Sequence, residues 1–500
     1  MPSRVTRRRF LESAATFAAG AAAGCATYHR KTQPAKQPNV LWLMTDEQRR
    51  DSMGCYGSPW AATPNLDGLA RDGVVFTRAV TPAPLCTPAR CSLLTGLYPA
   101  ETGVWTNHEG ASPPLPFLTD VFHAAGYDSA TFGKQHYSTR NRAFQVEKGP
   151  VLSAAVSYFK YAPQYDPRDY DVVQYPNLPY RWIFGGRYPE PIEHAAEYQV
   201  AAQAKQWLEE RDSAPDSARP FLLRLSFNCP HTPVSVVPPF DTIIPEGAVR
   251  FPGETESPPD KPAEWLSRDL CSISGSGCMR REEILKARRY YNGYVSYADH
   301  VFGDFLRWME ARGLLENTIV GFVSDHGTHI GDFGLFQKQT FYEPAATVPY
   351  FFWYPRGIGR GGRLNVPVST RTLLPTLLDL AGLEPPEGLQ GASLARQLHR
   401  GVEPERAPVF SGFTLASFER TPGDKLRPGE RIVMVRDGSW KLSLIHSPEP
   451  HDGFLVNLAE DPFERRNLYG RPEAAKEQAR LAGLIGDHLA AGRQPYPGCA

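Results

Sequence analysis

The amino-acid sequence predicts an α/β fold in which helices cover both faces of a central sheet, with a smaller α+β subdomain at the C-terminal end. Two observations predict it. Short continuous apolar runs alternate with helix-like segments before Gly401, and strand-like runs with a closing helix follow that residue. The 500 residues, 41% of them hydrophobic, can bury a core larger than that of one typical domain.

Each expected core strand is an apolar run without alternation, as in strands that are buried on both faces. The first run, 39–44, leads into Thr45, Asp46 and Glu47. The later runs of this kind are 129–133, 221–227, 318–323 and 348–353. Ligands of such sheets bind at the carboxyl ends of the strands, so the polar residues after these runs are the first candidates for a functional site.

The expected helices lie between these runs and after them. They cover 65–72, 116–125, 193–211, 281–312 and 373–381. Gly382 can end the last of them in the left-handed conformation, and the pair Pro385-Pro386 prevents the helix from resuming.

The C-terminal subdomain is expected to hold three strands and a final amphipathic helix. The strands are 407–413, 431–436 and 440–445, with Asp437-Gly438 as the hairpin turn, and the helix is 473–490. We therefore divide the chain into an N-terminal segment, 1–36, a main domain, 37–401, and the α+β subdomain, 402–500.

Charge and cysteine content exclude two broad classes of protein. Lysine plus arginine and aspartate plus glutamate number 54 each, so the formal net charge is zero and gives no support for nucleic-acid binding. Eight cysteines over this length are not a disulfide framework. Cys271 and Cys278 could close a small loop in an oxidising compartment, and two free thiols fit as well.

The first 36 residues have the features of an export signal and a tether. Arg7, Arg8 and Arg9 precede an Ala/Gly-rich apolar stretch, 13–24, which indicates export by the twin-arginine machinery. A basic tail would explain the arginines but not the alanine run. Cys25 follows Ala-Ala-Gly as in a weak lipobox, so a lipid anchor there and its absence both stay open. We expect a periplasmic or extracytoplasmic protein, either free or anchored as a lipoprotein.

One short stretch combines a cysteine, a helix-starting proline and an arginine. It reads Cys86-Thr-Pro-Ala-Arg90 and continues Cys91-Ser-Leu-Leu-Thr-Gly96. Pro88 suits the first helical position, which would place Cys86 at the positive N-terminal end of a helix, where anions bind. A buried structural cysteine is the competing interpretation. Cys91, one and a half turns further on, is expected to face the core.

The spacing Cys-x-Pro-x-Arg followed by Leu-Thr-Gly resembles the signature of type I sulfatases. The chain also carries, in order, four further segments that this family would require: 45–48 (Thr-Asp-Glu-Gln), 133–136 (Gly-Lys-Gln-His), 230–233 (Pro-His-Thr-Pro) and 324–327 (Ser-Asp-His-Gly), with Lys338 after them. Residues 454–468 resemble a segment common near the end of sulfatases. The resemblance therefore covers nearly the whole mature chain. It implies an alkaline-phosphatase-like fold, a mixed sheet between helices, and hydrolysis of sulfate esters.

Three carboxylates and one imidazole at two strand ends suit a divalent cation, with calcium as the first choice. They are Asp46, Glu47, Asp325 and His326. The resemblance makes Asp46, Asp325, His326 and residue 86 metal ligands. Glu47 stands where many sulfatases have a second aspartate, so direct ligation and a supporting role both stay open.

The resemblance also implies a covalent mechanism. A maturation enzyme oxidises Cys86 to formylglycine, whose hydrate attacks sulfur and then releases sulfate through its second hydroxyl. By the same resemblance, Arg90 and Lys134 position the diol and His136 is a candidate base. His231 and Lys338 hold sulfate oxygens and assist the leaving group. His300 and His329 are expected to be structural.

Residues 137–188 form an irregular stretch rich in aromatic residues and arginines, including Arg181 and Trp182. Such a loop could bind a sulfated sugar ring, or could be packed by its own aromatic side chains. Sulfated carbohydrate is the expected substrate. Two alternatives remain. One is a phosphonate monoester or phosphodiester hydrolase of the same superfamily, and the other is a noncatalytic binder of sulfated glycans in which Cys86 stays a thiol.

Overall fold

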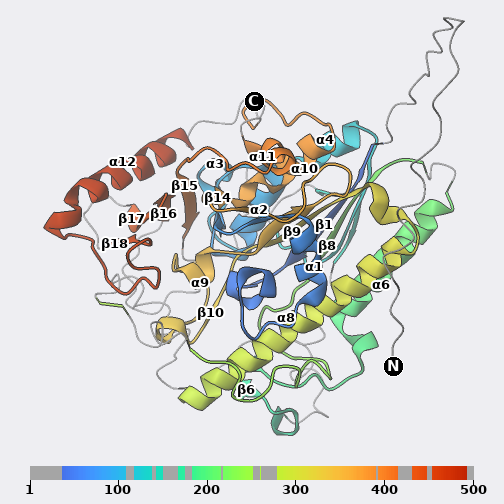
Figure 1. Cartoon of the computed structure of the whole chain (residues 1–500), viewed down its shortest axis with the longest axis horizontal. Coiled ribbons are helices and arrows are strands. Elements are labelled where there is room, and N and C mark those ends of the chain that lie inside the picture. Colours follow the sequence, from blue (N-terminus) through green and yellow to red (C-terminus); the bar gives the residue numbers. More distant parts are fainter. Residues whose placement is uncertain are drawn as a thin grey trace, which may run out of the picture. The chain divides into compact units, whose positions relative to one another are not determined.

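In the computed structural model, a central sheet and the helices that cover it form the unit that begins at Gln37 (Figure 1). The residues that the structure describes are 37–107, 117–137, 142–149, 167–174, 183–214, 218–251, 259–260, 279–389, 392–414, 431–446 and 453–492. Among the described helices, none combines the length and the apolar character that spanning a membrane requires.

A mixed sheet forms the centre of this unit. Its described strands lie in the order β13-β2-β12-β9-β1-β8-β4-β5. Their bounds are β1 Asn39–Thr45, β2 Val74–Phe76, β4 Asp128–Gly133, β5 Val146–Lys148, β8 Phe221–Ser226, β9 Thr318–Ser324, β12 Tyr350–Trp353 and β13 Gly362–Leu364. β12 runs antiparallel to β9 and β2, and the other neighbouring pairs are parallel. The predicted sheet is confirmed.

Alternate residues of β1 serve two separate cores. Val40, Trp42 and Met44 belong to the apolar cluster on one face, whereas Leu41 and Leu43 belong to the cluster on the other. The first face packs on α2 Cys86–Thr95, α4 Thr119–Ala124, α10 Leu373–Leu380 and α11 Ala395–Arg400. The second packs on α1 Pro64–Asp72, α6 Ala196–Asp212 and α8 Arg281–Glu310. Helices therefore cover both faces, as the alternation of apolar runs predicts (Figure 1).

The C-terminal subdomain is a four-stranded antiparallel sheet with one long helix. Its strands, in the order β15-β16-β17-β18, are Val409–Phe413, Arg431–Asp437, Trp440–His446 and Gly453–Asn457, and its helix is α12 Ala475–Ala491. Val433, Val435 and Leu442 pack with Leu481 and Ile485 of α12. The opposite side chains of the sheet, such as Ile432 and Met434, share a cluster with residues of the main domain. The sheet thus joins α12 to the main domain.

Several boundaries differ from the predicted ones for local reasons. Asp437 still pairs with Trp440, so the hairpin loop is Gly438-Ser439 and not Asp437-Gly438. Pro88 is the third residue of α2 and not the first, a position that it tolerates because none of the first four N–H groups of a helix has an intrahelical partner. Gly382 (φ 75°) ends α10 as expected.

Candidate active site

Neighbouring strand ends bring residues from distant parts of the chain together. Thr45 pairs with Ser324 across β1 and β9, so Asp46 and Asp325 follow at the same edge of the sheet. On the other side, Gly133 of β4 pairs with Ser226 of β8, and Lys134 comes next. Helix α2 then places Cys86 over these strand ends as its first residue.

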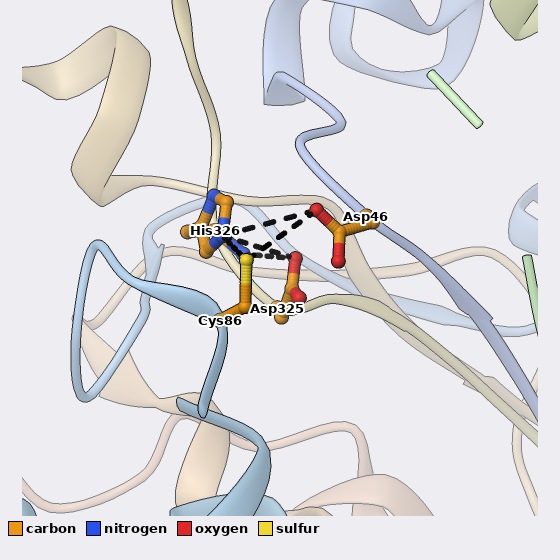
Figure 2. Close-up of side chains that lie close together, drawn as sticks. All are labelled: Asp46, Cys86, Asp325 and His326. Atoms are coloured by element: carbon orange, nitrogen blue, oxygen red, sulfur yellow. Dashed lines mark hydrogen bonds and ion pairs between the residues drawn. The ribbon is translucent and has the colours of Figure 1, made fainter. Parts of the chain in front are cut away.

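Cys86 is buried, and three side chains surround its sulfur. The Sγ atom lies 3.2 Å from His326 Nε2, 3.4 Å from Lys338 Nζ and 3.8 Å from Asp46 Oδ1. Figure 2 shows Asp46, Asp325 and His326 converging on this sulfur. The side chain of residue 86 therefore lies among one carboxylate, one imidazole and one ammonium group.

Arg90, one turn along the same helix, fixes both aspartates. Its Nη2 donates to Asp46 Oδ2 and its Nε to Asp325 Oδ2, each at 2.8 Å, and all three side chains are fully buried. Lys134 Nζ also lies 2.8 Å from Asp46 Oδ2. Asp46 consequently directs its other oxygen, Oδ1, towards Cys86. A buried guanidinium that bridges two carboxylates in this way is a rigid, charge-assisted clamp.

Glu47 contacts cationic side chains instead of completing the Asp325 cluster. Its carboxylate forms a short ion pair with Lys338 Nζ, and Oε1 is 3.4 Å from His231 Nε2. Lys338 Nζ is in turn 2.9 Å from His231 Nε2. The backbone of Glu47 is left-handed (φ 62°), and its N–H donates to Asp325 Oδ1 at 3.3 Å. Glu47 thus connects the two sides of the site and holds Lys338 beside the sulfur.

The protonation behaviour of these groups reflects a surplus of close charges. Burial and Asp46 oppose ionisation of Cys86, but Lys338, Lys134 and His326 hold the pKa of its thiol well below the usual value. Burial and the neighbouring Asp46 carboxylate raise the pKa of Asp325 to about 6. Burial lowers the pKa of His326, yet Asp325 and Cys86 raise it to about 9. Because the buried carboxylates of Asp46 and Asp325 repel each other, binding of a cation beside them would be favourable.

The donor set fits one divalent cation at a single place. Ligand atoms of Asp46, Cys86, Asp325 and His326 lie within 4.8 Å of one another, and all four residues are buried. Asp46, Glu47 and His231 form a second group of this kind. That second group already contains the Lys338 ammonium, which contacts Glu47 and His231. The first group, which has four possible ligands, is therefore our first candidate for a metal, and whether Glu47 also ligates it stays a prediction.

Some of the remaining residues predicted from the sequence lie within the described part of the chain, and others lie outside it. His136 is exposed and left-handed (φ 44°), and within the described part of the chain no hydrogen bond or ion pair joins it to Cys86. Its role as a base stays a prediction. Cys91 lies in the apolar core and His329 is buried with its Nε2 2.7 Å from Thr340 Oγ1. Residues 138–141, 150–166 and 175–182, with Arg181 and Trp182, lie outside the described residues, as do Cys25, Cys271 and Cys278.

Sequence reasoning missed three polar residues that support the site. Ser226 Oγ accepts from Arg90 Nη1 at 2.9 Å, Asn107 Oδ1 accepts from the Thr87 N–H at 2.9 Å, and Thr81 Oγ1 donates to the Asp325 carbonyl oxygen. Of these three residues, only Ser226 could have been suspected from the sequence, because it lies within a predicted strand. The other two belong to loops whose path depends on tertiary packing.

Comparisons with known proteins agree on one family. The protein-family model for sulfatases matches residues 38–383. A second family model, described as the C-terminal part of N-sulphoglucosamine sulphohydrolase, matches residues 331–489. An ulvan-active sulfatase of Formosa agariphila is 30% identical over 478 residues, which cover 93% of this chain and 83% of that protein. An N-acetylglucosamine-6-O-sulfatase of Bacteroides thetaiotaomicron is 25% identical over 540 residues, covering 94% and 89%.

A solved structure shows the same fold. The phosphonate monoester hydrolase of Agrobacterium radiobacter matches with a TM-score of 0.75 and 23% identity, over 91% of this chain and 96% of that one. The alkaline-phosphatase-like fold expected from the resemblance is thereby confirmed, and at this identity the match concerns the fold alone.

Proposed function

This chain belongs to the sulfatase family of sulfuric ester hydrolases, and we propose that it removes sulfate from carbohydrates with a nucleophile made from Cys86 and one divalent cation. The two relatives named for ulvan and for N-acetylglucosamine 6-sulfate support the substrate class. The main support for this proposal comes from the contacts of the Cys86 sulfur, which lies within 3.4 Å of both His326 Nε2 and Lys338 Nζ. A neutral structural cysteine has no need of such neighbours.

Oxidation of Cys86 to formylglycine would supply a hydrated aldehyde, with one hydroxyl for attack on sulfur and a second for release of sulfate. Arg90 cannot move freely, because its guanidinium is buried between Asp46 and Asp325, so it fixes the groups below the nucleophile. Lys338 and His231 lie together beside Glu47, and Lys338 Nζ is also 3.4 Å from the Cys86 sulfur. Their N–H groups are suited to hold sulfate oxygens and to assist the leaving alcohol.

Asp46, Asp325 and His326, with residue 86, would hold the cation, which we propose to be calcium. When bound, such a cation acidifies a coordinated hydroxyl and offsets negative charge that develops on the sulfuryl group. Glu47 would support this set through Lys338 and through its N–H bond to Asp325. Metal analysis of the purified protein, before and after chelation, tests the identity of the ion.

The decisive experiment is mass spectrometry of the peptide that contains Cys86, combined with turnover of a sulfate ester. We expect the mass of formylglycine at residue 86, and no turnover by Cys86→Ala or Cys86→Ser, since a serine ester lacks the second hydroxyl. Cys91→Ser is the matched control, because Cys91 is on the same helix and its side chain lies in the apolar core of the protein. Normal turnover by folded Cys86→Ala would overturn the mechanism. An unmodified, inactive thiol would favour a noncatalytic glycan binder.

A phosphonate monoester hydrolase is the second candidate, because a protein with that activity has the same fold at a TM-score of 0.75. Phosphonate monoesters and sulfate esters both carry one negative charge, so the same cations would serve either. Rates on an aryl sulfate and on the matched aryl phosphonate monoester would separate the two functions. We expect the sulfate ester to be the better substrate.

We further propose that the protein is exported by the twin-arginine machinery and converted by a formylglycine-generating maturation enzyme. The arginines at 7–9 and the apolar run 13–24 support the first part, and the Cys-x-Pro-x-Arg spacing at Cys86 supports the second. Periplasmic fractionation with N-terminal mass analysis would test the site of cleavage and any lipid on Cys25. Retention of an uncleaved, cytoplasmic chain would contradict the proposal.

A further inference from the structure

A pocket of about 320 Å³ lies beside the catalytic centre. Three segments form it: residues 133–136 after β4, residues 196–200 in the first turns of α6, and residues 226–228 at the end of β8. This volume is at the lower end for small-molecule pockets and suits a single ring with its substituents.

Two residues belong both to this pocket and to the centre. Lys134 lines the pocket, while its Nζ lies 2.8 Å from Asp46 Oδ2. Ser226 lines it as well, and its Oγ accepts from Arg90 Nη1 at 2.9 Å. Lys134 and Ser226 therefore connect the lining of the pocket directly to the Asp46 and Arg90 pair.

A third wall connects the pocket with the segment that carries His231. Glu197, in the first turn of α6, is buried and accepts from the Cys229 N–H at 3.1 Å. Cys229 lies two residues before His231, whose own N–H donates to the Asn228 carbonyl oxygen. The pocket thus lies between the two segments that present Lys134 and His231 to the reacting group.

The chemistry of the wall selects against charge. It exposes mainly carbon, to which Ala196, Val200 and Phe227 contribute. Among the described lining residues, Lys134 is the only lysine or arginine, and its ammonium is already paired with Asp46. Burial raises the pKa of Glu197, as expected for a carboxyl group in apolar surroundings. Besides His136, a second anionic group would find no unpaired basic side chain among the described lining residues, and it would meet this carboxyl group.

We propose that this pocket binds the uncharged ring that carries the scissile sulfate, a neutral sugar in a natural substrate, and disfavours a ring that bears a carboxylate. The proposal rests on the proposed function, because it takes the sulfate to lie at Cys86. It assigns the pocket to the ring and leaves the sulfuryl group to the catalytic centre.

The test compares ligands that share one sulfate ester and differ in the ring. Calorimetry with calcium-loaded Cys86→Ala avoids turnover, and the probes are phenyl sulfate, methyl sulfate and 4-carboxyphenyl sulfate. We expect phenyl sulfate to bind more tightly than methyl sulfate by on the order of tenfold, from burial of the ring, and 4-carboxyphenyl sulfate to lose that advantage. Adding Ala196→Phe should fill the pocket and bring phenyl and methyl sulfate to within about twofold of each other.

Ala202→Phe is the matched control, since Ala202 is an exposed residue of the same helix outside the pocket. It should keep the preference for phenyl sulfate. Equal binding of phenyl and methyl sulfate by the parent protein, or an unchanged preference in Ala196→Phe, would overturn the pocket assignment. Failure of the proposed function is seen separately, as absence of sulfate release by the unmutated protein.

Discussion

The junction between the two sheets contains a buried charge network that should make folding stability depend on pH. Lys441 Nζ of β17 lies 2.9 Å from Glu343 Oε1 and 2.5 Å from Glu464 Oε1. Arg436 of β16 lies 3.2 Å from Glu343, and Glu464 accepts from the Glu343 N–H at 2.7 Å. Glu343 begins the short helix α9 (Glu343–Ala346) of the main domain, so the network joins that domain to the C-terminal sheet.

The two carboxyl groups respond to this network in opposite directions. Burial raises the pKa of Glu464 from 4.5 to about 7, even though Lys441 counteracts the effect. Burial also acts on Glu343, but Arg436 and Lys441 hold its pKa well below the ordinary value. Because the folded state binds the Glu464 proton more tightly than the unfolded chain does, this group stabilises the fold at low pH. That contribution is lost as the pH rises through about 7.

Glu464→Gln should remove this part of the pH dependence. The difference between the two pKa values sets an upper limit of about 3 kcal/mol on the free energy involved. Urea unfolding at about pH 5 and about pH 8, at constant calcium, measures it. The loss of unfolding free energy between these pH values should be smaller in Glu464→Gln than in the parent by ~2 kcal/mol.

Glu460→Gln is the control, because Glu460 is an exposed residue of the same loop region. It should leave the pH dependence of the parent protein unchanged. If Glu464→Gln and the parent lost the same free energy from the lower to the higher pH, Glu464 would not titrate between them and the reasoning would be wrong.

Three further outcomes are expected. Lys441→Met removes the cation that Glu343 and Glu464 share, leaving only Arg436 beside Glu343, and should lower the free energy of unfolding by about 3 kcal/mol. Lys441 also donates to the carbonyl oxygen of Phe341, three positions after Lys338, so kcat should fall as well, and an unchanged kcat would contradict this positioning. Asp325→Asn should weaken calcium binding, measured by calorimetry, at least about tenfold, and Glu47→Gln should weaken it less. A larger loss in Glu47→Gln than in Asp325→Asn would mean that Glu47 ligates the metal, and full activity after exhaustive chelation would refute a role for a metal. Trp182→Ala should raise KM for a sulfated oligosaccharide and spare a small aryl sulfate; equal losses on both, with a lower Tm, would mean that this loop is structural.

The sequence predicts the positions of the candidate site residues where they follow long apolar runs. Asp46, Lys134 and Asp325 each come directly after such a run, and the parallel pairing of those strands then places them at one edge. Strand β2, Val74–Phe76, gives no such signal, because three residues are too few to show a pattern. It pairs with β12 and β13 only because the rest of the sheet is already present.

Side-chain pairing was far less predictable than position. Glu47 follows Asp46 in the sequence and so suggests a second metal ligand, yet its carboxylate pairs with Lys338, 291 positions away. No local pattern encodes this pair, since it depends on the path of the loop after β9 and on the left-handed backbone at Glu47. The network of Glu343 and Glu464 is equally invisible in the sequence, because it forms only when two separate sheets pack together.

The charges at the centre determine which class of ester binds there. The alcohol part of the ester must therefore be selected by the wall of the neighbouring pocket. The carboxylates of Asp46, Glu47 and Asp325 are matched by three cations that form direct ion pairs with them, Arg90, Lys134 and Lys338. A divalent cation would make this balanced set positive, which suits any singly charged ester and the doubly charged anion that leaves. Such a centre recognises the anionic ester group and does not by itself identify the alcohol. Discrimination between them falls to surfaces such as the pocket at Ala196, where a carboxylate would find no free cation.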